Sequence, residues 1–86
     1  MNLKLTNLRS LRNAGTIKYL VVIEQTETRY SAYSPDLLDC VSTGVTQPDV
    51  EHNMREAIAF HLEGLKLEGL AVPQPTTSSA YVEIAA

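Results

Sequence analysis

Apolar residues between positions 46 and 69 recur at steps of three and four, which is the spacing of one face of an α-helix. Charged side chains fall off this stripe, so the segment predicts a long helix that buries one side against a sheet or another helix. The stripe consists of Val50, Met54, Ala57, Ile58, Leu62 and Leu65.

Both ends of this predicted helix carry recognisable signals. Thr46 is a suitable N-cap, Pro48 falls in the first turn, and Asp49 places a negative charge near the positive end of the helix dipole. Gly69 suits the residue that follows a helix, with Gly64 as an earlier end.

Four other segments alternate or are rich in β-branched and aromatic residues. Residues 17–25 are apolar on both faces, which indicates a central strand, and residues 29–34 predict its antiparallel hairpin partner. Residues 40–45 predict a peripheral third strand, since Gly44 weakens pairing. Residues 80–85 predict a last strand after a connector interrupted by two prolines.

The predicted element order is therefore β-β-β-α-β, an α+β fold. A long helix allows a right-handed crossover, so the last strand is expected parallel to the first in a mixed four-stranded sheet of order 3-2-1-4. The helix covers one face of this sheet. The other face carries apolar and tyrosine residues, so we expect a homo-oligomer, either dimer or tetramer, or another protein partner.

Length and composition describe one ordinary globular domain, with 86 residues, 44% hydrophobic and 20% charged. We assign residues 17–86 to this domain and residues 1–16 to a basic N-terminal arm. The first 18 residues carry four basic and no acidic side chains, and the other 68 have a net charge of −7. An acidic body disfavours direct DNA binding and suits a basic protein partner.

Nothing in the sequence indicates a membrane span or a signal peptide, so a cytoplasmic protein is expected. The single cysteine, Cys40, can form no internal disulfide.

Several weak motifs occur in a particular joint order. They are YLVVIE (19–24), RYSAYSPDL (29–37), Cys40, Gly44, Thr46, MREAIAFHLEGL (54–65) and the prolines Pro73 and Pro75. Together they resemble the N-terminal domain of the HicB antitoxin family over residues 17–85. The resemblance implies a partial RNase H-like β-β-β-α-β fold and an antitoxin that covers the active site of a small HicA-like ribonuclease toxin.

Two features depart from the family pattern. The family often has Leu-Pro-Gly-Cys after the Pro-Asp pair, whereas Leu38 and Asp39 precede Cys40 here. The C-terminal DNA-binding domain that many members carry is not expected in this chain, so operator binding is not carried over.

Catalytic chemistry is not predicted, and no cofactor or metal is expected. A magnesium site on an RNase H-like sheet would need Glu24, Glu51 or Glu56, and Glu83 to converge, and solvent-facing roles are favoured instead. His52 and His61 point to nearly opposite sides of the helix. Cys40 is interpreted as a small buried residue. Tyr19, Tyr30, Tyr33 and Tyr81 could stack bases, although a core or interface role fits better without interleaved basic residues.

The sequence therefore predicts a non-enzymatic, protein-binding antitoxin-type domain. Its partner-binding residues are predicted to be Glu24, Tyr33, Asp36 and Asp39, with the acids pairing with a basic toxin surface. The alternative is a self-associating scaffold or regulatory domain without a toxin partner.

Overall fold

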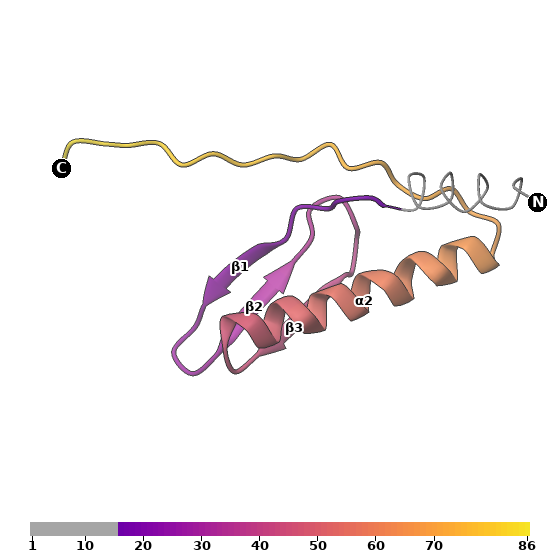
Figure 1. Ribbon diagram of the computed structural model, residues 1–86, viewed down its shortest axis with the longest axis horizontal. Helices are drawn as coiled ribbons and strands as arrows, with labels where there is room; N and C mark the ends of the chain where they lie inside the picture. The colour runs from indigo at the N-terminus through magenta and orange to yellow at the C-terminus, as the bar shows by residue number, and fades with distance from the viewer. Residues whose placement is uncertain (1–15) are drawn as a thin grey trace, which may run out of the picture.

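A computed structural model describes residues 16–86 and shows three strands followed by one long helix. The elements are β1 (Val22–Gln25), β2 (Tyr30–Tyr33), β3 (Val41–Gly44) and α2 (Gln47–Leu67) (Figure 1). The predicted N-terminal arm, except Thr16, lies outside the described residues. The α+β class is confirmed. No helix in the described part of the chain is long and apolar enough to cross a bilayer.

The three strands form an antiparallel sheet in the order β1-β2-β3. In its register Val22 lies opposite Tyr33, and Tyr33 opposite Val41. The predicted hairpin is confirmed: its turn is closed by the Thr26 amide, which donates to the Arg29 carbonyl over 2.8 Å, and by Thr26 Oγ1, which accepts from the Arg29 amide.

The caps of α2 follow the predicted pattern. Thr46 Oγ1 accepts a hydrogen bond from the Asp49 amide over 3.2 Å, satisfying one of the free amides of the first turn. At the other end Gly69 adopts a positive φ of 74°. The Gly69 amide donates to the Lys66 carbonyl and the Leu70 amide to the Leu65 carbonyl, which is the Schellman arrangement.

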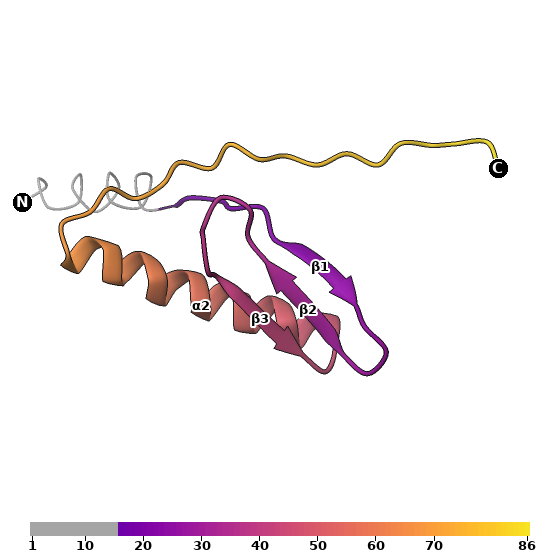
Figure 2. The same cartoon turned by 180° about the vertical axis from the view of Figure 1, so that it is seen from behind.

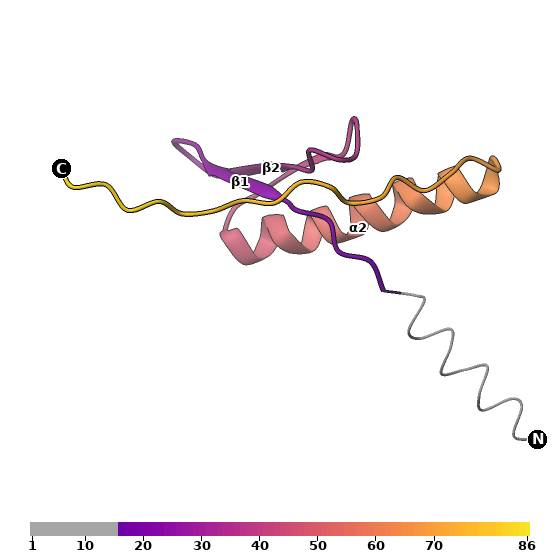
Figure 3. The ribbon, with the colours of Figure 1, turned by 90° about the horizontal axis from the view of Figure 1, so that it is seen from above.

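Figure 3 shows α2 on one side of the sheet, where it packs on β3 and β2. The buried core combines residues of β2, the β2–β3 loop, the start of β3 and the first half of α2. From the predicted stripe, Val50 and Met54 are fully buried, Ile58 and Leu62 are half-buried against this core, and Leu65 is also half-buried. The core side chains are Ala32, Leu37, Cys40, Val50 and Met54.

The end of β3 lies very close to the start of α2. A Cβ atom added at Gly44 would stand 2.5 Å from the Val50 amide nitrogen and 2.8 Å from the Val50 Cα. Both are backbone atoms, which cannot rotate away as a side chain does. Glycine is therefore required at position 44, although it is a weak strand former, because a side chain there would overlap the backbone of α2.

Residues 70–86, here called the tail, form no strand. The predicted fourth strand at 80–85 is absent, so the prediction of a mixed four-stranded sheet is wrong for the described chain. The predicted central position of the first strand is wrong as well, because β1 is an edge. The tail runs past β1 without pairing with it, and its prolines at 73 and 75 have no amide hydrogen to donate to a strand (Figures 1 and 2).

We predict that Gly44→Ala lowers the free energy of unfolding by about 1–3 kcal/mol, because the added methyl group meets helix backbone. The matched control is Gly64→Ala. Gly64 lies inside α2 with open space around it, so the alanine should raise stability by roughly 0.5–1 kcal/mol. Urea unfolding of both variants measures the difference, and equal effects of the two would contradict the close approach at Gly44.

Candidate protein-binding surface

The face of the sheet turned away from α2, here called the open face, is not covered by any segment of residues 16–86 (Figure 3). Alternation along the strands and the observed register place Val22, Tyr33 and Val41 in one row across it. Tyr33 is 43% exposed and Val41 65% exposed. An apolar row open to solvent is typical of a surface that another molecule covers.

The second row of the open face is polar. Glu24, Ser31 and Thr43 lie opposite one another in the register, and Glu24 is exposed. The structure therefore places two of the four predicted partner-binding residues, Glu24 and Tyr33, on the same face. The other two, Asp36 and Asp39, lie in the loop between β2 and β3.

The loop holds its two aspartates in different ways. Asp36 accepts hydrogen bonds from the amides of Thr76 and Thr77, both over 3.1 Å, and from their hydroxyls over 3.0 and 2.8 Å. We call this arrangement the clamp, because it fixes the tail to the loop. Asp39 is exposed and adopts a positive φ of 65°, a conformation that aspartate tolerates better than most residues. Next to it, Leu38 is 82% exposed.

A second contact fixes the tail close to the clamp. The Tyr19 hydroxyl donates to the Pro73 carbonyl over 2.5 Å. Desolvation raises the pKa of Tyr19, and the nearby charge of Asp36 adds to this effect. The pKa of Asp36 is lowered, mainly by the hydroxyl of Thr77, with further help from the two amides and the hydroxyl of Thr76. Ionised Asp36 therefore stabilises the conformation in which the tail is bound to the loop.

The clamp is the feature that the sequence analysis missed. Asp36 was predicted to face a partner, and its structural role toward Thr76 and Thr77 was not foreseen. The residues are 40 and 41 positions apart, so no local spacing signals the contact. The only available hint is composition: two adjacent threonines supply four donors after a rigid Pro-x-Pro segment.

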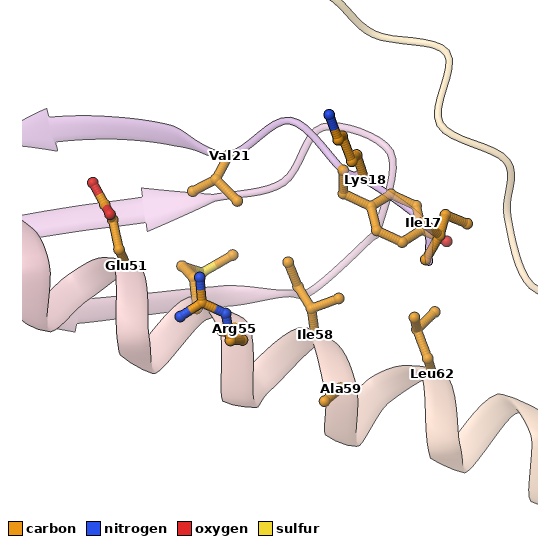
Figure 4. Close-up of a pocket in the computed structure, with 10 residues that line it drawn as sticks. Ile17, Lys18, Val21, Glu51, Arg55, Ile58, Ala59 and Leu62 are labelled. Atoms are coloured by element: carbon orange, nitrogen blue, oxygen red, sulfur yellow. The ribbon is translucent and has the colours of Figure 1, made fainter. Parts of the chain in front are cut away.

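A groove of about 510 Å³ lies between α2 and the residues leading into β1 (Figure 4). Its walls are Ile17, Tyr19 and Val21 on one side, and Ile58 and Leu62 on the other. The charged residues Lys18, Glu51 and Arg55 also line it. This composition suits an apolar side chain better than a charged ligand.

Among residues 16–86, a second groove is lined by Cys40 and His61, together with Asp39 and Glu68. The Cys40 thiol is buried, donates weakly to the Ala57 carbonyl over 4.0 Å, and has a pKa raised by desolvation and by the charge of Asp39. His52 lies 3.3 Å from Glu56 one turn along α2. Within residues 16–86, no group of three histidine, cysteine, aspartate or glutamate side chains could hold a metal ion.

Comparison with known proteins places this sequence in a family. Residues 19–85 match the family model described as "HicB_like antitoxin of bacterial toxin-antitoxin system". The chain belongs to the HicB-like antitoxin family. The matched range contains the sheet, α2, the clamp and nearly all of the tail, so the predicted resemblance is confirmed.

Two curated relatives of this HicB-like chain have no function in their descriptions. One is an uncharacterized 14.9 kDa protein in the rep-hol intergenic region of Haemophilus phage HP1, 31% identical over 64 residues, which are 74% of this chain and 48% of the relative. The other is a UPF0150 protein of Helicobacter pylori, 37% identical over 65 residues, which are 74% of this chain and 90% of the relative. The chain thus spans about half the length of the phage protein. No solved structure gives a significant match.

The clamp of the HicB-like chain should open in acid. Because the folded-state pKa of Asp36 is lowered, its contribution is complete above the ordinary value of 3.8 and is lost as the pH falls below that value. We predict that the amide NMR shifts of Thr76 and Thr77 move to those of a released tail across this range. Asp36→Ala should show the released shifts already at neutral pH.

The matched control for this experiment is Asp39→Asn, which changes an exposed carboxylate in the same loop and tolerates the positive φ. Its Thr76 and Thr77 shifts should follow those of the wild type. Identical titration of these amides in the wild type and in Asp36→Ala would show that Asp36 does not hold the tail.

Proposed function

We propose that this HicB-like domain neutralises a small HicA-like ribonuclease toxin by binding over the toxin's RNA-cleaving surface with its open face. The observation that carries the proposal is the uncovered row of Val22, Tyr33 and Val41 on a member of an antitoxin family. The domain acts by binding rather than by catalysis, in the cytoplasm, and without direct DNA contact.

The chemistry of the open face matches such a partner. Protein interfaces combine an apolar, often aromatic centre with a polar rim, and Tyr33 is the aromatic residue of the row. A ribonuclease presents basic side chains to the phosphates of RNA. The exposed acids Glu24 and Asp39 complement that charge, which chiefly raises the association rate and the specificity.

Asp36 takes an indirect part in this proposal. Its carboxylate already accepts four hydrogen bonds from Thr76 and Thr77, so it has little capacity left for a toxin side chain. We propose that Asp36 positions the loop, while the exposed Leu38 and Asp39 beside it make the contact.

A self-associating scaffold is the second candidate. The exposed apolar residues of the tail favour it, since they need a partner whether or not a toxin exists. A gene for a small basic ribonuclease next to this one would favour the antitoxin function, and the absence of such a gene would favour the scaffold.

The antitoxin proposal predicts that Tyr33→Ala weakens binding of a cognate HicA-like ribonuclease by about 2 kcal/mol, or roughly 30-fold, as for an aromatic residue at the centre of an interface. The matched control is Phe60→Ala. Phe60 is an aromatic residue on α2, 80% exposed, and lies away from the open face. Calorimetry measures affinity, and growth on co-expression with the toxin measures neutralisation.

Loss of binding in Phe60→Ala with none in Tyr33→Ala would move the interface from the open face to α2.

A charge test separates the rim from the centre: reversing Glu24 and Asp39 to lysine should slow association in low salt and leave dissociation nearly unchanged. Unchanged association kinetics would remove these two acids from the interface.

A further inference from the structure

The groove between α2 and residues 17–21 leaves part of the helix stripe uncovered (Figure 4). Met54 of the stripe is fully buried, whereas Ile58 and Leu62, which lie one and two turns further along α2, are only half-buried. These two side chains point into the groove, toward Ile17 on its other wall. The volume of about 510 Å³ is more than one apolar side chain occupies. The groove is therefore an unfilled extension of the core.

Charged side chains stand only at the rim of this groove. Lys18, Glu51 and Arg55 are exposed and carry charges of both signs, so they do not select a charged ligand. Within residues 16–86, no buried side-chain nitrogen or oxygen atom lacks a hydrogen-bond partner, so the groove has no unused polar group to offer. The groove therefore requires an apolar occupant.

The sequence immediately before the groove supplies apolar side chains. Ile17 lines the groove, so residues 1–15 join the described chain at its edge. They include four leucines and no acidic residue. Leu8 and Leu11 are the leucines nearest to the groove in sequence, and residues 13–15 (Asn-Ala-Gly), which follow them, are of types that favour a turn. A turn there directs the two leucines back toward the groove.

We propose that the groove is filled by Leu8 and Leu11 of the same chain. In this arrangement the two leucines pack between the wall formed by Ile17 and the wall formed by α2. Leu11 lies six positions before Ile17, a separation that an extended chain spans with about 20 Å. Ile58 and Leu62 are one helical turn apart, or about 6 Å. Both wall residues of α2 are therefore within reach.

The covalent attachment favours this occupant over a separate molecule. Closing a loop of a few residues costs little entropy, and a segment held by a short linker has an effective concentration in the millimolar range. A free apolar ligand has to displace the attached leucines before it can enter. The groove is thus a place where the N-terminal arm is anchored to α2.

The inference goes beyond the family and does not rest on the antitoxin proposal. The range that matches the family model begins at residue 19, after the arm. The groove lies between α2 and the chain leading into β1, on the helix side of the sheet. The row of Val22, Tyr33 and Val41 therefore stays exposed when the groove is filled.

Aspartate at position 11 tests the contact. Leu11→Asp removes an apolar side chain and places a charge between apolar walls, so we expect the unfolding equilibrium constant of the full-length protein to rise at least about tenfold. The matched control is Ser10→Asp, which adds the same charge at the neighbouring position and should change this constant by no more than about twofold. Urea unfolding followed by the circular dichroism of α2 measures both variants.

Neither substitution changes a residue of the described core, so both variants should keep the helical signal of the wild type in the absence of urea. Equal unfolding constants for Leu11→Asp and Ser10→Asp would overturn the proposal.

Methyl NMR identifies which side chains fill the groove. We expect nuclear Overhauser effects from the methyl groups of Leu8 and Leu11 to those of Ile58 and Leu62. In an equimolar mixture of isotope-labelled and unlabelled full-length protein, a filtered spectrum reports only contacts between molecules, and these effects should be absent from it. Effects found only between molecules would place the arm of another copy in the groove, and an absence of effects would leave the groove without the leucines; either result refutes the proposal.

Discussion

The packing of α2 on a short sheet is the constraint on which the rest of the described structure depends. A helix of 21 residues is about 32 Å long, whereas a strand of four residues spans only about 13 Å. The first half of α2 therefore covers β2 and β3, and its second half extends beyond them (Figure 1). Within residues 16–86, that mismatch confines the buried core to five side chains and leaves Ile58 and Leu62 as the wall of a groove.

The same shortage of cover determines where binding can occur. Among residues 16–86, α2 covers one face of the sheet, and no segment covers the opposite face or pairs with the outer edge of β1. The two surfaces differ in chemistry. The open face offers side chains, with Tyr33 between two valines and acids nearby, whereas the β1 edge offers backbone groups. The described part of the chain therefore offers two kinds of surface, one of side chains and one of backbone groups.

Features of this fold were predictable from the sequence where the interacting residues lie close together along the chain. The N-cap at Thr46, the end at Gly69 and the hairpin before Arg29 were predictable because their hydrogen bonds join residues within five positions of one another. The alternation in residues 80–85 predicted a strand, but alternation does not encode whether a neighbouring strand is within reach, and these residues pair with none of the described strands. The first strand begins at Val22, later than predicted. Before it, the Leu20 carbonyl accepts a hydrogen bond from the Ser34 side chain, a contact that the strand pattern does not predict.

The candidate site was partly predictable for the same reason. Tyr33 and Glu24 share a face because alternation and hairpin register are local properties, and the register brings their rows together. The role of Asp36 was not accessible, since its donors lie 40 residues away and approach only after the tail has turned back past α2. Gly44 was interpreted as a weakness in a strand, whereas its function is to leave room for the helix backbone.

The contacts of the tail join residues far apart in the sequence, and this affects how the protein is exposed to proteases. Contacts between β1, β2, β3 and α2 join neighbours in the sequence and can form early, whereas the contacts at Pro73 and Thr77 close loops of 54 and 41 residues. The body is thus complete while residues 80–85 are still exposed, and exposed extended ends are preferred sites of proteolysis. A protease that cuts beyond the clamp would therefore remove exposed residues and leave the buried core untouched.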